Sequence, residues 1–246
     1  MKVFFAAAAA ATAALCLNSA QAANPADYVA VPTVEYGERE IDFKFGNFNT
    51  RGEERFSVAS VGFGLGVKER WFTELYLKYE REGSEGTKLD AFEWENRFLL
   101  TEPGQFPLDI GLLTEIERPR DRAEGYEFRF GPLLQTDFGK VQLNGNLLFE
   151  RHYRAEQDGP MEMGYQWQVK YRWMRELEFG LQGFGEFGKW DDHLPSDQQS
   201  HRVGPAVFGK IRMGERQALK WNAAYLAGTT RSSPDHNFRM LVEYEF

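Results

Sequence analysis

The sequence predicts an all-β fold, a transmembrane antiparallel up-and-down β-barrel of about twelve strands, and three observations favour it. Runs of about ten residues alternate apolar and polar side chains with period two, as strands with two unlike faces do. The chain holds 21 Phe, 10 Tyr and 6 Trp although 27% of its residues are charged. Beyond the N-terminal region, no apolar run approaches the roughly 18 residues that a transmembrane helix needs.

The N-terminal 22 residues have the features of a cleaved secretory signal peptide. Lys2 supplies a positive charge, residues 3–17 are apolar and rich in alanine, and Ala20-Gln21-Ala22 matches an A-x-A cleavage site, so the mature chain is predicted to start at Ala23. An uncleaved membrane helix is the alternative, and the short apolar run with its small-residue exit favours cleavage. The single cysteine, Cys16, follows a leucine rather than the small residue that a lipoprotein site needs. The mature chain therefore has neither a thiol nor a disulfide.

The rest of the chain divides into a leader and a barrel. Residues 23–33 form a short periplasmic leader, too small for a plug domain, and residues 34–246 form the barrel. Gly, Pro, Asp and charged turns separate the alternating runs. The predicted strands are 34–46, 56–67, 71–80, 92–100, 108–117, 126–135, 141–150, 163–173, 177–188, 200–212, 218–228 and 237–246.

The links between these strands test the topology independently. With both termini periplasmic, every second link should be a tight periplasmic turn. The predicted periplasmic links are 68–70, 101–107, 137–140, 174–176 and 213–217, whereas the links 118–125, 154–162 and 189–199 are longer and more polar. A soluble β-sandwich is the alternative, but it would not need outward faces this aromatic and uncharged.

The last predicted strand places five apolar side chains on one face, and the chain ends on an aromatic residue. These residues are Phe238, Met240, Val242, Tyr244 and Phe246. This ending resembles the closing strand of Gram-negative outer-membrane β-barrels. The resemblance implies that these residues act as an assembly signal for the outer-membrane assembly machinery. It also implies that the protein lies in the bacterial outer membrane, with lipid and lipopolysaccharide as its surroundings.

In length, strand count and ending, the chain also resembles small monomeric porin-like barrels, which include twelve-stranded channels specific for acidic sugars. The resemblance implies passive passage of small hydrophilic solutes, often anionic sugars bound on a basic wall. The chain carries no ligand-binding motif of those channels. Its interior is predicted to mix acidic and basic residues, which argues against a purely anionic substrate.

Charged side chains at inward positions divide into two groups. Strands in the first half of the barrel turn carboxylates inward: Glu74, Glu93, Glu95, Glu115, Glu117 and Glu127. Strands from residue 163 onward turn cations inward: Lys170, Arg172, Arg202, Lys210, Lys220 and Arg239. We therefore predict an acidic wall that faces a basic wall. Opposite charges across a narrow tube would orient a polar or zwitterionic solute, which favours a polar diffusion channel.

A non-conducting structural or interaction barrel with an ion-paired interior is the competing hypothesis. Cross-strand ion pairs neutralise buried charge and close the interior without forming a channel. The hairpin registers predict three of them: Lys78–Glu93, Glu74–Arg97 and Glu115–Arg129.

The remaining motifs give weaker hypotheses. Four histidines fall near aspartates at the predicted extracellular end, but without the spacing of metal ligands: His152, His193, His201 and His236. A lipid-modifying enzyme would need a serine beside a histidine, and the candidates are Ser200, Ser232 and Ser233 near His201 and His236. We predict neither metal, cofactor nor enzymatic activity. The basic stretch 118–122 is a candidate contact for lipopolysaccharide, and the net charge of −8 argues against nucleic acid as a partner.

Overall fold

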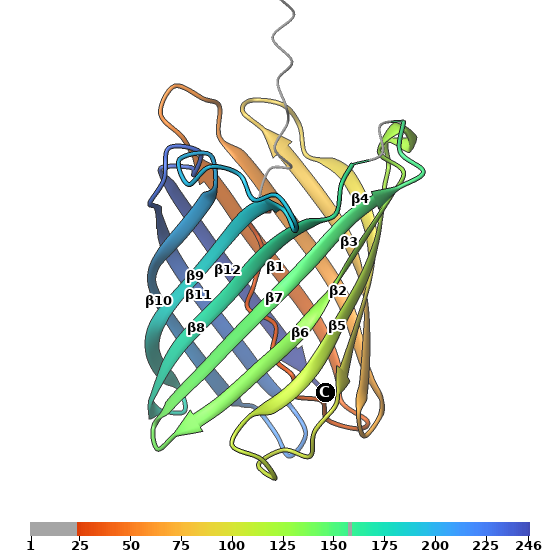
Figure 1. Cartoon of the computed structure of the whole chain (residues 1–246). Helices are drawn as coiled ribbons and strands as arrows, with labels where there is room; N and C mark the ends of the chain where they lie inside the picture. The colour runs from red at the N-terminus through yellow and green to blue at the C-terminus, as the bar shows by residue number, and fades with distance from the viewer. Residues whose placement is uncertain (1–23, 157–158) are drawn as a thin grey trace, which may run out of the picture.

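The computed structural model describes residues 24–156 and 159–246, so the predicted signal peptide lies outside the described residues. Within these ranges the chain forms a closed barrel in which β1 pairs with β12 and every other strand pairs with its neighbours in sequence (Figure 1). The strands are β1 (Arg39–Asn49), β2 (Phe56–Lys68), β3 (Trp71–Glu82), β4 (Lys88–Leu99), β5 (Asp109–Pro119), β6 (Tyr126–Phe138), β7 (Val141–Tyr153), β8 (Glu162–Met174), β9 (Leu177–Lys189), β10 (Ser200–Arg212), β11 (Ala218–Gly228) and β12 (His236–Glu245). A 3-10 helix, η1 (Arg122–Glu124), precedes β6.

This topology confirms the predicted twelve-stranded antiparallel up-and-down barrel. We call the end that holds the C terminus the lower end and the opposite end the upper end (Figure 1). The lower links 69–70, 139–140 and 175–176 have two residues each, whereas the upper links 154–161 and 190–199 have eight and ten. The lower link 100–108 is a long exception. No helix among the described residues is long and apolar enough to cross a membrane.

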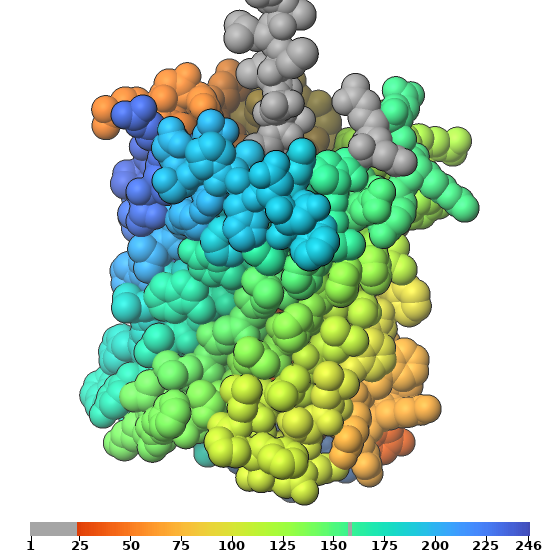
Figure 2. Space-filling model, in the orientation of Figure 1, coloured from red at the N-terminus to blue at the C-terminus, as the bar shows by residue number. Residues whose placement is uncertain are grey.

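The outer face is apolar and exposed, whereas the inner face is polar and buried. Phe63 on β2 and its partner Leu75 on β3 are 50% and 63% exposed, whereas the inward Glu74, next to Leu75 on β3, is 1% exposed. Figure 2 shows the front wall as a continuous surface, with the link 190–199 over its upper rim. Alternation of side chains along each strand produces both faces.

We expect Phe63→Arg, which places a charge in the middle of this apolar face, to lower the free energy of unfolding by about 2–4 kcal/mol. Urea titration of the barrel refolded into lipid vesicles measures this loss. Phe106→Arg, at an exposed position on the lower link 100–108, is the matched control and should leave stability unchanged. Equal effects of the two changes would contradict a lipid-facing role for the outer face.

The first strand begins later than the sequence predicts. Alternation suggested a strand from residue 34, but β1 starts at Arg39. The chain turns first: Gly37 adopts a φ of 80°, in the left-handed region that favours glycine, and its N–H donates to the carbonyl of Gly66 at 2.9 Å. The N–H of Gly66 donates in return to Glu38 at 2.9 Å. This turn redirects the chain from the interior of the barrel into its wall.

Residues 24–38, which we call the lumen segment, run inside the barrel from the upper end to the lower end (Figure 1). Its residues Pro25 and Pro32 are fully buried, and Ala30 is 1% exposed. The sequence predicted residues 23–33 as a periplasmic leader too small to act as a plug. The structure instead places residues 24–33 within the lumen. We correct that prediction accordingly.

Neighbouring residues of the lumen segment pack against opposite walls. Val29 lies in an apolar cluster formed by β9, β10 and β11, which includes Phe184 and Phe208. Ala30 lies in a second cluster with inward leucines of β5, β6 and β7: Leu113, Leu133 and Leu148. In an extended chain successive side chains point in opposite directions, so one short segment fills the space between the two walls.

Candidate functional site in the barrel lumen

Polar contacts fix the lumen segment along its length. The hydroxyl of Tyr28 donates to the Glu95 carboxylate at 2.6 Å, and the Asn146 amide donates to the Ala30 carbonyl at 2.9 Å. Asp27 forms an ion pair with Arg129 at 3.3 Å. Inside the barrel the segment gives up hydrogen bonds to water, and these contacts with the wall replace some of them.

Small residues in the wall let the lumen segment approach closely. A Cβ atom at Gly46 would overlap the carbonyl of Pro25, which also accepts a hydrogen bond from Asn237 at 3.0 Å. At Gly111 a Cβ would lie 2.8 Å from the Cβ of Pro32. The wall and the segment therefore fit each other at both the upper and the lower part of the lumen.

All six carboxylates of the predicted acidic wall point into the lumen and are buried. Cations from the same side of the barrel meet them. Arg97 lies within 3.3 Å of Glu40 and Glu95 and within 3.7 Å of Glu74. Lys78 pairs with Glu93 at 3.7 Å and contacts Glu117 more closely. This wall is therefore largely neutralised within itself.

The three predicted ion pairs form, but one predicted register is wrong by two residues. Glu115 lies directly opposite Arg129, as predicted, with 3.7 Å between the charged groups. Between β3 and β4, however, Glu74 lies opposite Glu95 and Lys78 opposite Ala91, and the register shifts at a bulge after Lys78. The pairs Lys78–Glu93 and Glu74–Arg97 are consequently diagonal.

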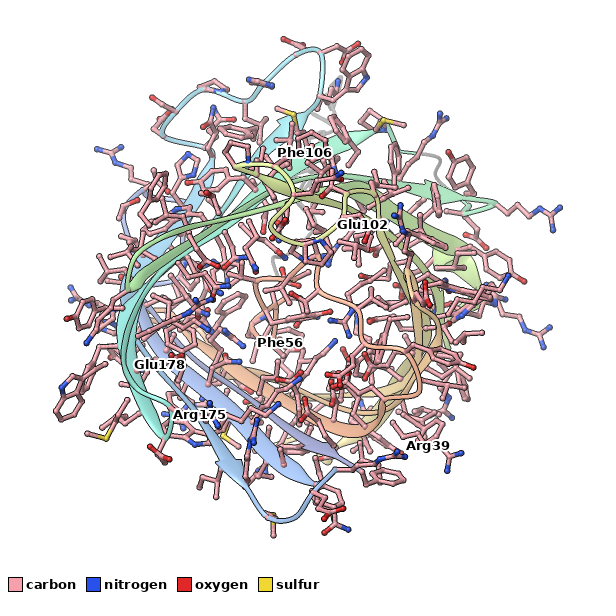
Figure 3. All side chains as sticks on the ribbon, turned by 90° about the horizontal axis from the view of Figure 1, so that it is seen from below. Arg39, Phe56, Glu102, Phe106, Arg175 and Glu178 are labelled. Carbon is pink, nitrogen blue, oxygen red and sulfur yellow. The ribbon has the colours of Figure 1, made fainter. Side chains whose placement is uncertain are left out.

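The predicted basic wall separates into two levels. Near the lower end each cation has an acidic partner: Lys170 pairs with Glu178 at 3.3 Å, Arg172 with Asp137 at 3.0 Å, Lys210 with Glu245 at 2.8 Å, and Lys220 with Glu38 of the lumen segment at 3.2 Å. Arg202 and Arg239 lie higher and are 2% and 1% exposed. Both lie within about 6 Å of the Phe184 ring. Seen from below, side chains from all sides converge on the interior (Figure 3).

A chain of buried amides joins β6 to β12 around the lumen, and the sequence analysis did not identify it. Asn144 donates to Gln135 at 3.0 Å, Gln168 to Asn144 at 2.9 Å, and Gln182 to Gln168 at 3.0 Å. Arg239 completes it by donating to Gln182 at 2.7 Å. The inward parity of these amides was visible in the sequence, but their connection depends on the strand registers.

At the upper end the lumen opens into a cavity of about 290 Å³, which we call the cup. Its wall includes residues from β2 to β10, and Asn24 and Asp27 of the lumen segment also line it. Burial raises the pKa of the Glu124 carboxyl in η1, and the nearby Asp90 and Asp121 carboxylates raise it further. Burial is the larger cause of this shift in pKa, and the two carboxylates add to it.

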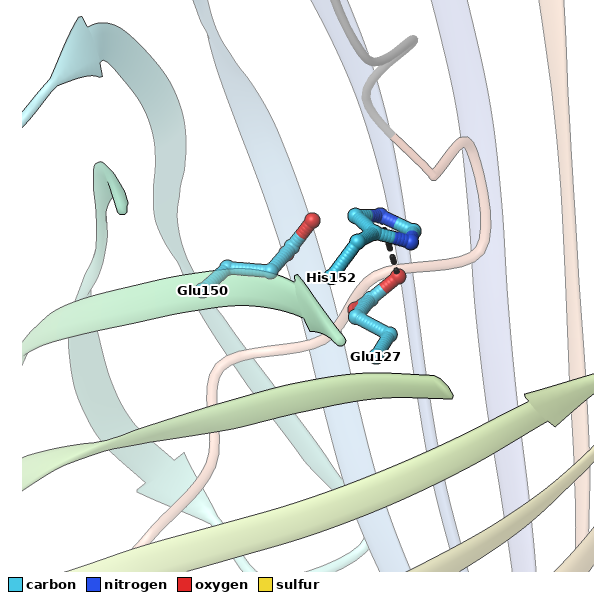
Figure 4. A group of neighbouring side chains, drawn as sticks. All are labelled: Glu127, Glu150 and His152. Atoms are coloured by element: carbon cyan, nitrogen blue, oxygen red, sulfur yellow. Dashed lines mark ion pairs between the residues drawn. The ribbon is translucent and has the colours of Figure 1, made fainter. Parts of the chain in front are cut away.

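Among the described residues, one group that could hold a metal ion contains a histidine: Glu127, Glu150 and His152 (Figure 4). His152 lies 3.6 Å from Glu127, and Glu150 pairs with Arg129 at 3.1 Å. Three further groups contain carboxylates alone. Two carboxylates and one imidazole suit a divalent cation. In the group with the histidine, however, Glu127 and His152 pair with each other, and Glu150 pairs with Arg129.

The other three predicted histidines do not gather into a site. His193 and His201 both pack on Phe187, with ring centroids 5.2 and 5.8 Å away. His236 stacks on Tyr225 at 5.5 Å. Their roles in the described structure are contacts between rings at the upper rim.

Ser232 and Ser233 contact backbone atoms rather than imidazoles, and the Ser200 hydroxyl has no hydrogen-bond partner among the described residues. Ser233 accepts from the N–H of His201 at 2.7 Å, while the His201 ring contacts the Tyr165 hydroxyl at 3.0 Å and the Gln199 amide at 2.9 Å. Ser232 donates to a backbone carbonyl at 3.2 Å. A nucleophile needs a base within hydrogen-bond reach, so this geometry gives no support to a serine–histidine enzyme. The absence of enzymatic activity stays a prediction.

The basic stretch 118–122 is partly used within the protein. Arg118 lies over the Tyr126 ring at 4.4 Å and donates to the carbonyl of Gly125. The backbone N–H of Arg120 donates to Asp90 at 2.7 Å. Contact of this stretch with lipopolysaccharide stays a prediction.

Comparison with solved structures shows that the fold is similar to that of outer-membrane channels of similar size. The KdgM porin matches with a TM-score of 0.55 at 9% identity, over 84% of this chain and 99% of the porin. The COG4313 outer membrane channel from Pseudomonas putida F1 matches with 0.55 at 10% identity, over 89% and 98%. The NanC porin matches with 0.52 at 11% identity, over 84% and 98%.

The fold is that of small outer-membrane porins. No family model and no curated protein matches the sequence. At these identities the likeness to KdgM, COG4313 and NanC concerns the arrangement of strands, and the side chains that fill the lumen belong to this chain. The resemblance drawn from strand count and ending is confirmed at the level of the fold.

Proposed function

We propose that the protein is a passive channel of the outer membrane for small polar solutes, and that the lumen segment closes it in the conformation described here. The observation that carries this proposal is that a separate piece of chain, rather than the wall alone, fills the space between the two apolar clusters. A twelve-stranded barrel encloses more space than its own side chains fill, so removal of the segment would leave a passage lined by these two clusters and by the polar side chains around them.

The competing function is a non-conducting structural barrel. The amide chain from β6 to β12 and the ion pairs around Arg97 favour it, because they would remain in place without the lumen segment. The KdgM porin has also been solved with disordered oligogalacturonate, and that ligand belongs to KdgM. The charges in this lumen are mixed in sign and most of them are paired, so we propose small polar solutes rather than acidic sugars.

A disulfide between the segment and the wall would separate the two functions. Pro32 and Gly111 offer a pair in direct contact: a Cβ at Gly111 would lie 2.8 Å from the Cβ of Pro32, so the segment must move outward by about 1 Å to reach the roughly 4 Å that a disulfide needs. We expect the refolded mature double variant Pro32→Cys/Gly111→Cys to give ohmic steps in a planar bilayer when reduced and none when oxidised. Addition of reductant should restore the steps.

The single variant Pro32→Cys, treated with the same oxidant, is the control and should conduct throughout. Conductance that is equal in the oxidised and reduced double variant would show that the segment does not close the channel. Absence of steps in wild type, in the reduced variant and in a barrel without the segment would favour the structural barrel.

A further inference from the structure

The cup at the upper end carries a large surplus of negative charge. Nine acidic side chains line it, against three basic ones, Lys78, Arg129 and Arg202. Among the described residues, four of the acidic side chains form no ion pair within 4 Å: Glu80, Asp90, Glu124 and Glu162. A concave site with unpaired carboxylates concentrates cations.

Acidic clusters alone are common on protein surfaces. In the cup, however, the buried cation Arg202 is a second and independent observation that points to a ligand. Arg202 lines the cup and is 2% exposed. Its Nη1 donates to Asn237 at 3.1 Å, whereas its Nε and Nη2 atoms have no hydrogen-bond partner among the described residues. Buried donors without partners are costly, so such a pair indicates a group that completes them.

The free atoms of Arg202 have the geometry for a carboxylate. Nε and Nη2 form one edge of the planar guanidinium, and that edge binds two oxygens of a carboxylate in parallel. The nearby carboxylate of the protein, Glu186, lies 3.7 Å from Nη2, beyond hydrogen-bond distance. The Phe48 and Phe184 rings lie 4.8 and 5.6 Å from the guanidinium carbon and hold its plane in place.

We propose that the cup binds a small molecule that carries ammonium groups and one carboxylate, such as a basic amino acid. Its carboxylate lies on the Nε–Nη2 edge of Arg202, and its ammonium groups lie among the unpaired carboxylates. A cavity of about 290 Å³ suits a molecule of this size. This ligand class deepens the proposed function by naming a solute that the upper end would collect. Binding itself does not require conduction, because the lumen segment lines the cup in the closed conformation.

Titration calorimetry on the refolded mature barrel tests the proposal with three probes of similar length. L-lysine carries both kinds of group, cadaverine lacks the carboxylate, and glutarate lacks the ammonium groups. We expect lysine to bind on the order of tenfold more tightly than cadaverine, since one charge-assisted contact separates them. Glutarate should give no heat of binding.

Two variants test which residue binds the carboxylate of the ligand and which binds its ammonium groups. Arg202→Gln should remove the preference for lysine over cadaverine and leave cadaverine binding in place. Glu162→Gln should weaken both amines, and Glu82→Gln, an exposed residue of β3 outside the cup, should weaken neither. If Arg202→Gln fails to fold, Arg202→Lys, which keeps the charge but not the planar edge, should still reduce the preference.

Three results would overturn the proposal: no binding of lysine, binding of glutarate as tight as that of lysine, or an unchanged preference in the Arg202 variants. Lysine binding by a barrel that never conducts would support the cup and refute the channel. Ohmic steps in a barrel that does not bind lysine would support the channel and refute the binding site in the cup.

Discussion

Removal of residues 24–33 should convert the refolded barrel from a mostly closed to an open state, with mean conductance raised by on the order of tenfold or more. The deletion takes away Tyr28, Val29 and Ala30, which bridge the two walls of the lumen. Water would replace them, and the carboxylate of Glu95 would then face the passage rather than the Tyr28 hydroxyl. Single-channel recording in a planar bilayer at fixed salt measures the change.

A point variant should reproduce part of this effect without shortening the chain. Ala30→Asp places a charge between Leu113, Leu133 and Leu148, so the closed state should lose stability and openings should become more frequent. Ser84→Asp adds the same charge at an exposed position on an upper link and is the matched control. Unchanged conductance in both the deletion and Ala30→Asp would mean that the wall alone closes the lumen.

Arg97→Met should be the most destabilising single substitution in the lumen, with a loss of about 3–5 kcal/mol in the free energy of unfolding. It leaves the carboxylates of Glu40, Glu74 and Glu95 in a buried interior without the guanidinium that they share. The two oxygens of Glu74 already lack hydrogen-bond partners among the described residues, so the nearby charges of Lys44 and Arg97 stabilise this carboxylate. Urea unfolding in detergent micelles, followed by the shift of the folded band on a gel, measures the loss.

Arg70→Met provides the comparison, because Arg70 pairs with Glu102 at the lower end and both side chains are about half exposed. Exposed ion pairs contribute about 0–1 kcal/mol, so this change should be nearly neutral. A small effect of Arg97→Met, similar to that of Arg70→Met, would show that water reaches the middle of the lumen and screens its charges.

Alternation predicted the strands well because lipid on one side and a polar interior on the other constrain every second residue. Phe63 and Glu74 both fall on the faces that their parity assigns. The registers were less predictable. A bulge after Lys78 moves the pairing of β3 with β4, and nothing in the side-chain pattern marks where one residue drops out of the ladder.

The lumen segment was missed although the sequence carries a signal for it. Leu113, Leu133 and Leu148 break the polar pattern of the inner face, at positions that a water-filled barrel would give to polar side chains. Three apolar exceptions on neighbouring strands indicate that something apolar packs there. These leucines could not be assigned a partner from the sequence, because the segment that covers them, Tyr28 to Ala30, has the composition of an ordinary linker. The assembly role of Phe246 and the mature start at Ala23 stay predictions.

The lumen segment makes the number of times that the described chain passes from one end of the barrel to the other odd instead of even. Twelve wall strands alone would bring the chain back to the side from which it started, but residues 24–38 add a thirteenth crossing through the interior. Asn24 consequently lies at the opposite end from Phe246 (Figure 1). A label attached just before Asn24 and a label attached after Phe246 would therefore report from opposite sides of one membrane. Exit of the segment from the lumen would bring both labels to the same side.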